Sequence, residues 1–352
     1  MQLEFKPDFE QARQRWTAYW KGESDRPVVA SVVPKESVTP VEAPRYLAAF
    51  SCEPDAIIDQ VLAWAETHEF LGEAIPFYYL EFGADHFSAL LGGELRLHEG
   101  SGDTSWLVPF VGEDWDEAEI RFQPECYWWR RTVEFIRAFR ARCDGKLLVA
   151  APTLVAGLDC LAAIGGQERL AMDLVMQPEA VQRALSRVRK AYEEILDALA
   201  VELDYETWGS LNRHGFYSPG RTNVPQCDFS CMISKEMFAE FQLPCLAHES
   251  QQLDHSCYHL DGPGAIHHLE AICSLPGIQA IQWVAGAGAG EQQDWMRLHR
   301  RIDELGKGQY FGGNAETVER LARRFRSKQL YFRTSIPKRE LDSLLLKLES
   351  RR

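Results

Sequence analysis

The sequence has few features of a membrane or secreted protein. None of its apolar runs approaches the about 18 consecutive residues that a membrane-spanning helix needs. Residues 1–8, Met-Gln-Leu-Glu-Phe-Lys-Pro-Asp, lack the apolar core of a secretion signal. We therefore expect a cytoplasmic protein without a membrane partner.

Basic residues are also scarce relative to acidic ones. The 352 residues include 38 Lys and Arg against 52 Asp and Glu, a formal charge of -14. Such a charge repels phosphate at long range. We therefore expect no general binding to nucleic acid or to anionic membranes.

Cysteine and glycine motifs of known function are missing too. The nine cysteines form no Cys-x-x-Cys pair, and a chain of this size needs no disulfides, so most should be reduced and buried. The Gly-Ala-Gly-Ala-Gly tract at 286–290 matches neither the Gly-x-x-x-x-Gly-Lys-Ser/Thr nor the Gly-x-Gly-x-x-Gly phosphate-binding pattern.

What the chain does contain is a regular alternation of apolar runs and helical patterns. Short β-branched or apolar runs such as 28–33, 147–151, 257–260 and 330–333 alternate with amphipathic stretches such as 178–203 and 338–348. This order predicts an α/β protein, a (β/α)8 TIM barrel forming one domain over 1–352. An N-terminal helical extension at 9–21 and a β-hairpin excursion at about 94–112, turning at Gly-Ser-Gly-Asp 100–103, complete the prediction.

The strongest sign of a functional site is the segment Cys257 to Gly264. His259 and Asp261 are two residues apart, so in a strand both point to the same face. Pro263 stops the strand directly after them. A polar pair at the C-terminal end of a strand is typical of α/β active sites.

Two further strand ends carry polar side chains. Gln226, Cys227 and Asp228 follow one run, and Gln282 and Trp283 end another. In a barrel these ends meet at one edge. We expect the substrate to be bound by polar and aromatic side chains from these segments and the preceding loop: Trp208, Arg213, Tyr217, Gln226, Gln282 and Trp283.

Three interpretations of this cluster stay open on the residues alone. His259 and Asp261, with Cys227 or Asp228 as third ligand, suit zinc or another divalent metal. Alternatively, His259, Asp261 and Asp228 act as catalytic acids and bases without a metal. Asp261 could instead cap the following helix.

Residues 150–157 read Ala-Ala-Pro-Thr-Leu-Val-Ala-Gly, and a Pro-Glu helix start follows within 172–181. These motifs resemble those of the uroporphyrinogen decarboxylase superfamily. Asp228-Phe229 is similar to an Asp segment of the family, and residues 259–262, His-Leu-Asp-Gly, are similar to its His-x-Cys-Gly strand end. The resemblance implies a (β/α)8 barrel.

Within that superfamily the chain looks closer to the methyltransferases than to the decarboxylases. The decarboxylases carry arginines after the first strand, where residues 31–35 read Ser-Val-Val-Pro-Lys, and an aspartate near 77–80, where this chain has none. The methyltransferases hold zinc through His-x-Cys and a later cysteine; here the matching positions are His259, Asp261 and Thr334.

The resemblance therefore implies methyl transfer between a small methylated substrate or thiol and a corrinoid, such as methylcobalamin, on a partner protein. One alternative is a metal-free decarboxylase or lyase acting on a carboxylated small molecule. Another is a carbohydrate-active hydrolase, because Asp228 and Asp261 could supply two carboxylates. The oligomeric state is not predicted.

Overall fold

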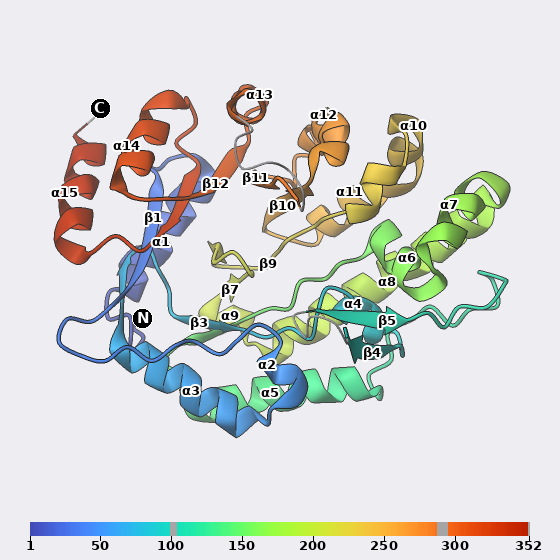
Figure 1. Ribbon diagram of the computed structural model, residues 1–352, viewed down its shortest axis with the longest axis horizontal. Coiled ribbons are helices and arrows are strands. Elements are labelled where there is room, and N and C mark those ends of the chain that lie inside the picture. Colours follow the sequence, from blue (N-terminus) through green and yellow to red (C-terminus); the bar gives the residue numbers. More distant parts are fainter. Residues whose placement is uncertain (99–103, 287–294, 351–352) are drawn as a thin grey trace.

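The computed structural model describes residues 1–98, 104–286 and 295–350, which form a mixed α/β fold (Figure 1). The strands are β1 (Val28–Pro34), β2 (His68–Gly72), β3 (Phe77–Tyr79), β4 (Glu94–Leu97), β5 (Ser105–Val108), β6 (Leu148–Ala150), β7 (Ser210–Leu211), β8 (Tyr217–Ser218), β9 (Thr222–Asn223), β10 (His255–Asp261), β11 (Ala280–Val284), β12 (Gly308–Gly312) and β13 (Leu330–Thr334).

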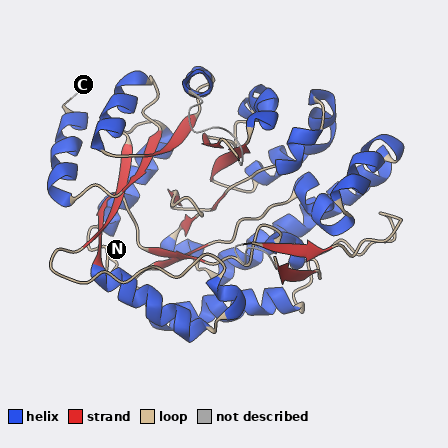
Figure 2. Ribbon diagram, in the orientation of Figure 1, coloured by secondary structure: helices blue, strands red, loops and turns tan. Residues whose placement is uncertain are grey.

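Helices lie around the outside of the strands (Figure 2). The α-helices are α1 (Phe9–Lys21), α2 (Ala48–Ser51), α3 (Pro54–Thr67), α4 (His86–Ala89), α5 (Tyr127–Cys143), α6 (Gly157–Gly165), α7 (Gln167–Met176), α8 (Pro178–Glu202), α9 (Tyr205–Trp208), α10 (Lys235–Met237), α11 (Leu243–Gln251), α12 (Leu269–Ser274), α13 (Met296–Glu304), α14 (Ala315–Arg324) and α15 (Lys338–Glu349). Short 3-10 helices span Asp228–Met232 and Pro263–His268, and a π-helical turn spans Phe238–Gln242.

One large sheet organises the fold. Its strands lie in the order β2, β1, β13, β12, β11, β10, β9, and every neighbouring pair is parallel except β1 with β2. A separate parallel pair joins β3 to β6. Because parallel neighbours end at the same edge, the C-terminal ends of β10 to β13 lie on one side, where side chains from distant segments can meet.

The mostly parallel sheet agrees with the predicted α/β class, but the ladders between the described strands do not join into a closed ring. The sequence did not predict β2, which pairs antiparallel with β1 from Ala30↔Gly72 to Pro34↔His68. The backbone groups of β1 that face away from β13 are therefore already paired by β2. Closure of an eight-stranded barrel, and one domain over the whole chain, stay predictions.

Two local features modify the predicted elements. β4 and β5 form an antiparallel pair within the span of the predicted hairpin, whose turn at 100–103 lies outside the described residues. The helical segment that begins at Lys235 and ends at Gln251 is interrupted by the π-helical turn at Phe238–Gln242. Pro244 explains the interruption, because proline has no N–H for the helical ladder and its ring crowds the preceding turn.

Aromatic packing attaches α1 to the sheet. The ring of Trp16 lies 4.9 Å from that of Tyr331 on β13 and 5.7 Å from that of Phe216, measured between centroids. The Trp20 indole stacks on His255 at the start of β10, with 4.7 Å between centroids. The predicted N-terminal helix is thus part of the core and contacts both β10 and β13.

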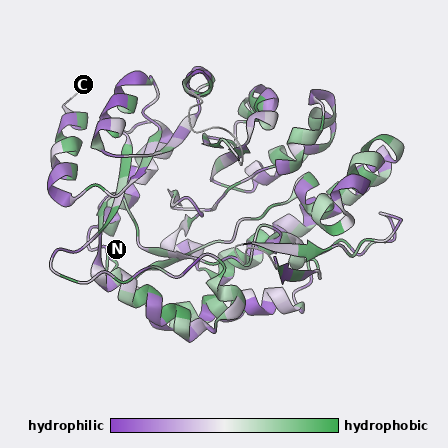
Figure 3. Cartoon of the chain, in the orientation of Figure 1, coloured by the Kyte–Doolittle hydropathy of each residue, from purple (hydrophilic) through white to green (hydrophobic). Residues whose placement is uncertain are grey.

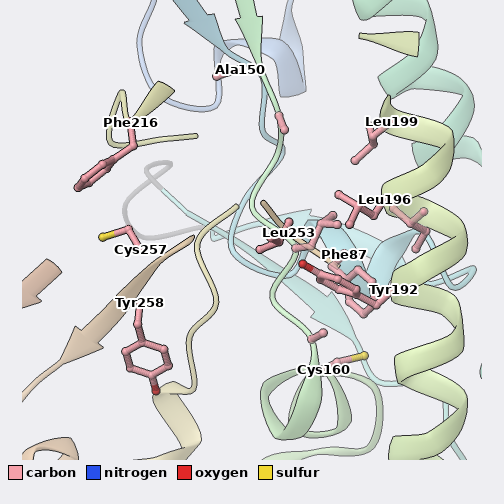
Figure 4. Packing of buried hydrophobic residues seen from close by; sticks show 14 of the residues in the cluster. Phe87, Ala150, Cys160, Tyr192, Leu196, Leu199, Phe216, Leu253, Cys257 and Tyr258 are labelled. Atoms are coloured by element: carbon pink, nitrogen blue, oxygen red, sulfur yellow. The ribbon is translucent and has the colours of Figure 1, made fainter. Parts of the chain in front are cut away.

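The long helix α8 supplies another part of the core. Figure 4 shows Tyr192, Leu196 and Leu199 on its inner face, with Phe87 and Cys160 close by. These residues are buried and recur at helical spacing. Hydrophilic residues occupy much of the outward helical surface (Figure 3).

No helix in the described part of the chain is long and apolar enough to cross a membrane. The nine cysteines are all free thiols, and most of them are buried. The expected burial of most cysteines therefore agrees with the structure.

A buried ion pair fixes the entry to β1. The guanidinium of Arg26 donates two hydrogen bonds to the carboxylate of Glu73, at 2.7 and 3.0 Å, and each side chain is only 4% exposed. Glu73 also accepts the backbone N–H of Val29 at 2.8 Å. Glu73, the residue that directly follows β2, therefore holds the start of β1 beside the end of β2.

Glu73→Ala should lower the free energy of unfolding by about 3–5 kcal/mol, because the buried Arg26 guanidinium loses its two-point partner and keeps only the more exposed Glu349 carboxylate, at 3.2 Å from Nε. Urea unfolding followed by circular dichroism measures the change. Glu94→Ala is the matched control: Glu94 pairs with Arg96 on the surface, with both side chains more than half exposed, and its loss should cost less than about 1 kcal/mol. Equal losses in the two variants would contradict the assignment.

Candidate functional site

The strongest cluster of polar side chains forms where β10, β11 and the segment after β9 run side by side. β10 and β11 pair in register, with His259 opposite Gln282. The backbone N–H of His259 donates to the Pro225 carbonyl at 3.0 Å. Gln226 and His259 form an isolated parallel β-bridge. Segments that are far apart in the sequence thus present their polar side chains at one place.

Asp228, His259 and Asp261 offer ligand atoms that all lie within 4.8 Å of one another. The two residues predicted to share a strand face therefore do so, and Asp228 joins them. The Oδ1 atom of Asp261 is buried and has no hydrogen-bond partner within the described residues. Gly286, with φ of 74°, lets the chain pass close to this carboxylate. The rest of the glycine tract, 287–290, lies outside the described residues.

Gln282 orients the imidazole of His259. The Nδ1 atom of His259 makes a short hydrogen bond with the side-chain oxygen Oε1 of Gln282. Because an amide oxygen only accepts, Nδ1 carries the proton in this pair, and Nε2 keeps a free lone pair. Such a second contact is the usual way in which proteins select the tautomer of a metal-binding histidine.

The titration behaviour of the cluster follows from its surroundings. Burial and the nearby Arg213 guanidinium lower the pKa of His259 to about 4, so the imidazole is neutral near pH 7. Asp228 is exposed as a residue, yet its carboxyl group is packed among protein atoms. This loss of hydration, together with the charges of Asp159 and Asp261, raises the pKa of Asp228 above its usual value.

Cys227 does not belong to the group of possible ligands. The carboxylate of Asp159 lies close to its thiol and accepts the backbone N–H groups of Asp228 and Phe229 at 2.9 and 2.8 Å. Burial raises the pKa of the Cys227 thiol well above its usual value, which disfavours the thiolate that a metal needs. Of the two candidates for a third ligand, the structure brings Asp228 to His259 and Asp261.

Arg213 and Gln226 continue the cluster. Arg213, in the turn between β7 and β8, donates to Gln226 Oε1 at 2.8 Å, and Gln226 in turn donates to Asp228 at 3.2 Å. The Nε of Arg213 also donates to His214, whose ring lies 6.2 Å from that of His259. His214 has a pKa well below its usual value because of burial and the Arg213 charge.

The other predicted substrate-binding residues, Trp208, Tyr217 and Trp283, make their aromatic contacts outside this cluster. Trp208 and Tyr217 pack around Phe9 of α1, with ring centroids 6.3 and 5.6 Å away, and the Tyr217 hydroxyl donates to the Trp208 carbonyl. Trp283 contacts Trp295 edge-on at 4.9 Å. Aromatic contacts of this kind are typical of protein cores. A role in substrate binding stays a prediction for Trp208, Tyr217 and Trp283.

A buried carboxyl group near Arg213 was missed in the sequence. Glu81 is 4% exposed, accepts the Tyr46 hydroxyl at 2.7 Å and the Thr153 N–H at 3.4 Å, and has a pKa raised by burial. It follows Tyr79 by two residues at the end of β3. That spacing, equal to the spacing of His259 and Asp261, was the available signal.

The residues present fit a divalent metal. One imidazole nitrogen and two carboxylate oxygens are ordinary ligands for zinc and for harder divalent ions. The unpartnered Oδ1 of Asp261 and the free Nε2 of His259 are both groups that a cation would satisfy. The arrangement can also move protons, since the Asp228 carboxyl holds its proton to a higher pH than usual.

Comparisons with known proteins describe the fold. No family model matches the sequence, and no curated protein matches it. A methyltransferase from Methanosarcina mazei has a similar structure, with a TM-score of 0.61 and 11% identity over 96% of this chain and 98% of its own. A B12-independent methionine synthase from Shewanella sp. W3-18-1 is similar at a TM-score of 0.38 and 12% identity, over 73% of this chain and 72% of its own. At 11% identity, the first likeness shows a shared fold.

Gln282→Ala should weaken zinc binding by about 10–100-fold, because the imidazole of His259 loses the contact that orients it. Competition with a chromophoric chelator measures the affinity. Gln60→Ala, on the exposed face of α3, is the matched control and should bind zinc like the wild type. An unchanged affinity in Gln282→Ala would argue against His259 as a ligand.

Zinc binding should also weaken as the pH falls from 8 to 5. The raised pKa means that Asp228 takes up a proton at a higher pH than an ordinary aspartate, and that proton competes with the cation. His259, with a pKa of about 4, stays neutral over most of this range and adds little. The same chelator competition at several pH values provides the test. A pH-independent affinity would exclude Asp228 from the ligand set.

Proposed function

We propose that the protein is a methyltransferase-like enzyme of the uroporphyrinogen decarboxylase superfamily. It transfers a methyl group between a small methylated substrate or thiol and a corrinoid carried by a partner protein. The observation that carries the proposal is the meeting of Asp228, His259 and Asp261 at the C-terminal end of β10. The fold shared with a methyltransferase and the motifs around residues 150–157 and 259–262 support it.

In this proposal Asp228, His259 and Asp261 hold zinc. When bound, such an ion acts as a Lewis acid and lowers the pKa of a coordinated thiol or water. Gln282 keeps the Nε2 atom of His259 directed to the cation by accepting a hydrogen bond from the Nδ1–H group. Two carboxylates form a harder ligand set than the cysteines of the resembling methyltransferases, and therefore favour oxygen-bearing over thiol substrates.

The neighbouring residues would position the substrate. Arg213 offers a guanidinium beside the cluster, and its hydrogen bond to Gln226 fixes its orientation. Gln226 separates this positive charge from the Asp228 carboxyl, to which it donates. An anionic group on the substrate would thus be held on one side of Gln226 while the reacting group lies on the other, close to the candidate ligands.

One observation favours a second candidate, a metal-free decarboxylase or lyase. Glu81 is a buried carboxyl group whose raised pKa keeps it protonated at a higher pH than an ordinary glutamate. Such a group can deliver a proton to the carbanion that forms when a substrate carboxylate is lost as CO2. In that case His259 and Asp261 bind substrate or move protons, and the protein needs no metal.

Metal analysis of the purified protein separates the two candidates. We expect near-stoichiometric zinc in the zinc-supplemented wild type and its loss in His259→Ala and Asp261→Ala. His267→Ala, at an exposed histidine nearby, is the control and should retain the metal. A folded wild type that binds no added zinc would overturn the metal site and favour the lyase.

The methyl-transfer step is tested with methylcobalamin and a panel of thiol, hydroxyl and carboxylate acceptors, following the cobalamin spectrum. Demethylation that depends on the wild-type protein and is lost in His259→Ala supports the proposal. A zinc-loaded protein that leaves the spectrum unchanged across the panel would contradict corrinoid-linked methyl transfer.

A further inference from the structure

A cavity of about 460 Å³ is lined by Arg213, which connects through Gln226 to the candidate metal ligand Asp228. Its walls are mainly apolar and come from β1, the segment 43–47, α3, β2, β3 and β13. Aromatic side chains dominate them, in particular Trp64, Phe70, Phe77 and Tyr78. The volume is in the range of sites for small organic molecules, and flat aromatic walls favour a flat apolar ligand.

The charge around this cavity has a single sign. Arg45, Arg213 and Arg333 line it, and among the described residues no Asp or Glu does. Neither Arg213 nor Arg333 forms an ion pair within the described chain, whereas arginines such as Arg26 and Arg183 are paired with carboxylates. The buried Glu81 carboxyl lies near Arg213 without forming an ion pair with it, and in a chain with a formal charge of -14 two such unpaired guanidinium groups at one cavity indicate an anionic ligand.

The guanidinium groups are also the main hydrogen-bond donors of the cavity wall that remain available to a ligand. The Tyr46 hydroxyl donates to Glu81, the Tyr79 hydroxyl bonds to Thr153, and the Tyr331 hydroxyl donates to the His214 carbonyl. The hydroxyl of Tyr46 also ties the segment 43–47 to the end of β3, so this wall is in place before a ligand arrives. Three of the four tyrosine hydroxyls that line the cavity, all but that of Tyr78, are thus already engaged.

Each of two arginines is held with donors to spare. Arg213 donates through Nε and Nη2 to His214 and Gln226, which leaves its Nη1 amino group without a partner in the described structure. Arg333, from the C-terminal end of β13, lies over the Phe77 ring at 6.0 Å. A planar guanidinium fork matches the two oxygens of a carboxylate, and several forks around one cavity hold it firmly.

We propose that this cavity binds the carboxylate group of a small molecule with a flat, apolar body, with Arg213 and Arg333 as its anion-binding residues. Arg213 connects this cavity through Gln226 to Asp228, and this connection identifies the bound molecule as the substrate of the enzyme. That identification rests on the proposed function. Binding itself needs no metal. The body of the ligand lies against Phe77 and Trp64, and its carboxylate faces the two guanidinium groups.

Calorimetric titration with 2-naphthoate and with its neutral analogue 2-naphthamide tests the proposal. The wild-type protein, treated with a chelator to remove metal, should bind the carboxylate about ten-fold or more tightly than the amide. Arg333→Gln and Arg213→Gln should each remove most of that preference while leaving the affinity for the amide unchanged. The quenching of tryptophan fluorescence on binding, to which Trp64 in the cavity wall contributes, gives an independent readout.

Arg130→Gln is the matched control, because it removes one positive charge from an exposed position on α5 outside the cavity. It should keep the full preference for the carboxylate. Arg333 is exposed, so its variant is expected to fold even if Arg213→Gln does not, and circular dichroism verifies both. Equal affinity for the two compounds, or a preference that survives in Arg333→Gln, would overturn the proposal.

The outcome does not depend on the test of the proposed function. A protein that binds 2-naphthoate through Arg333 but no zinc would keep the carboxylate site and reject the metal-dependent enzyme. A protein that binds zinc through His259 but shows no preference for the carboxylate would keep the metal site and reject this inference.

Discussion

The pairing of β1 with β13 is the contact on which the arrangement of the molecule depends. Four residues of β1, from Val28 to Ser31, lie opposite Tyr331 to Thr334 across a separation of about 300 residues in the chain. The Ser31 hydroxyl strengthens the junction by donating to the Ile336 carbonyl at 2.8 Å. Because β13 stands next to β1, its exposed end carries Arg333 to the cavity beside the N-terminal strands, while the rest of the sheet leads across to β10 and its acidic cluster.

Much of the fold could be predicted because its signals are local. Helix α1, strand β1 and strand β10 each follow from periodicity within a dozen residues, and their observed bounds lie close to the predicted ones. Strand β2 could not be found in this way. His-Glu-Phe-Leu-Gly has no alternating apolar pattern, and it becomes a strand because the edge of β1 is available to pair with it. The closed ring expected of a barrel depends on the same long-range pairing.

The candidate site shows the same division. His259 and Asp261 could be placed together because a strand fixes the direction of alternate side chains. Between Cys227 and Asp228 the sequence could not choose, because a 3-10 helix begins there and its orientation depends on Asp159, many residues earlier. Glu81 was overlooked because β3 is only three residues long and gives little periodic signal.

The junction of β1 with β13 also sets an order of events during synthesis. The ribosome releases β13 about 300 residues after β1, so the early strand must wait for its neighbour. In the meantime β2, which follows β1 within the same short stretch, can already cover one edge of it. The antiparallel β1–β2 pair therefore covers one edge of an apolar strand in the nascent chain, and β13 completes the sheet only after about 300 intervening residues have emerged.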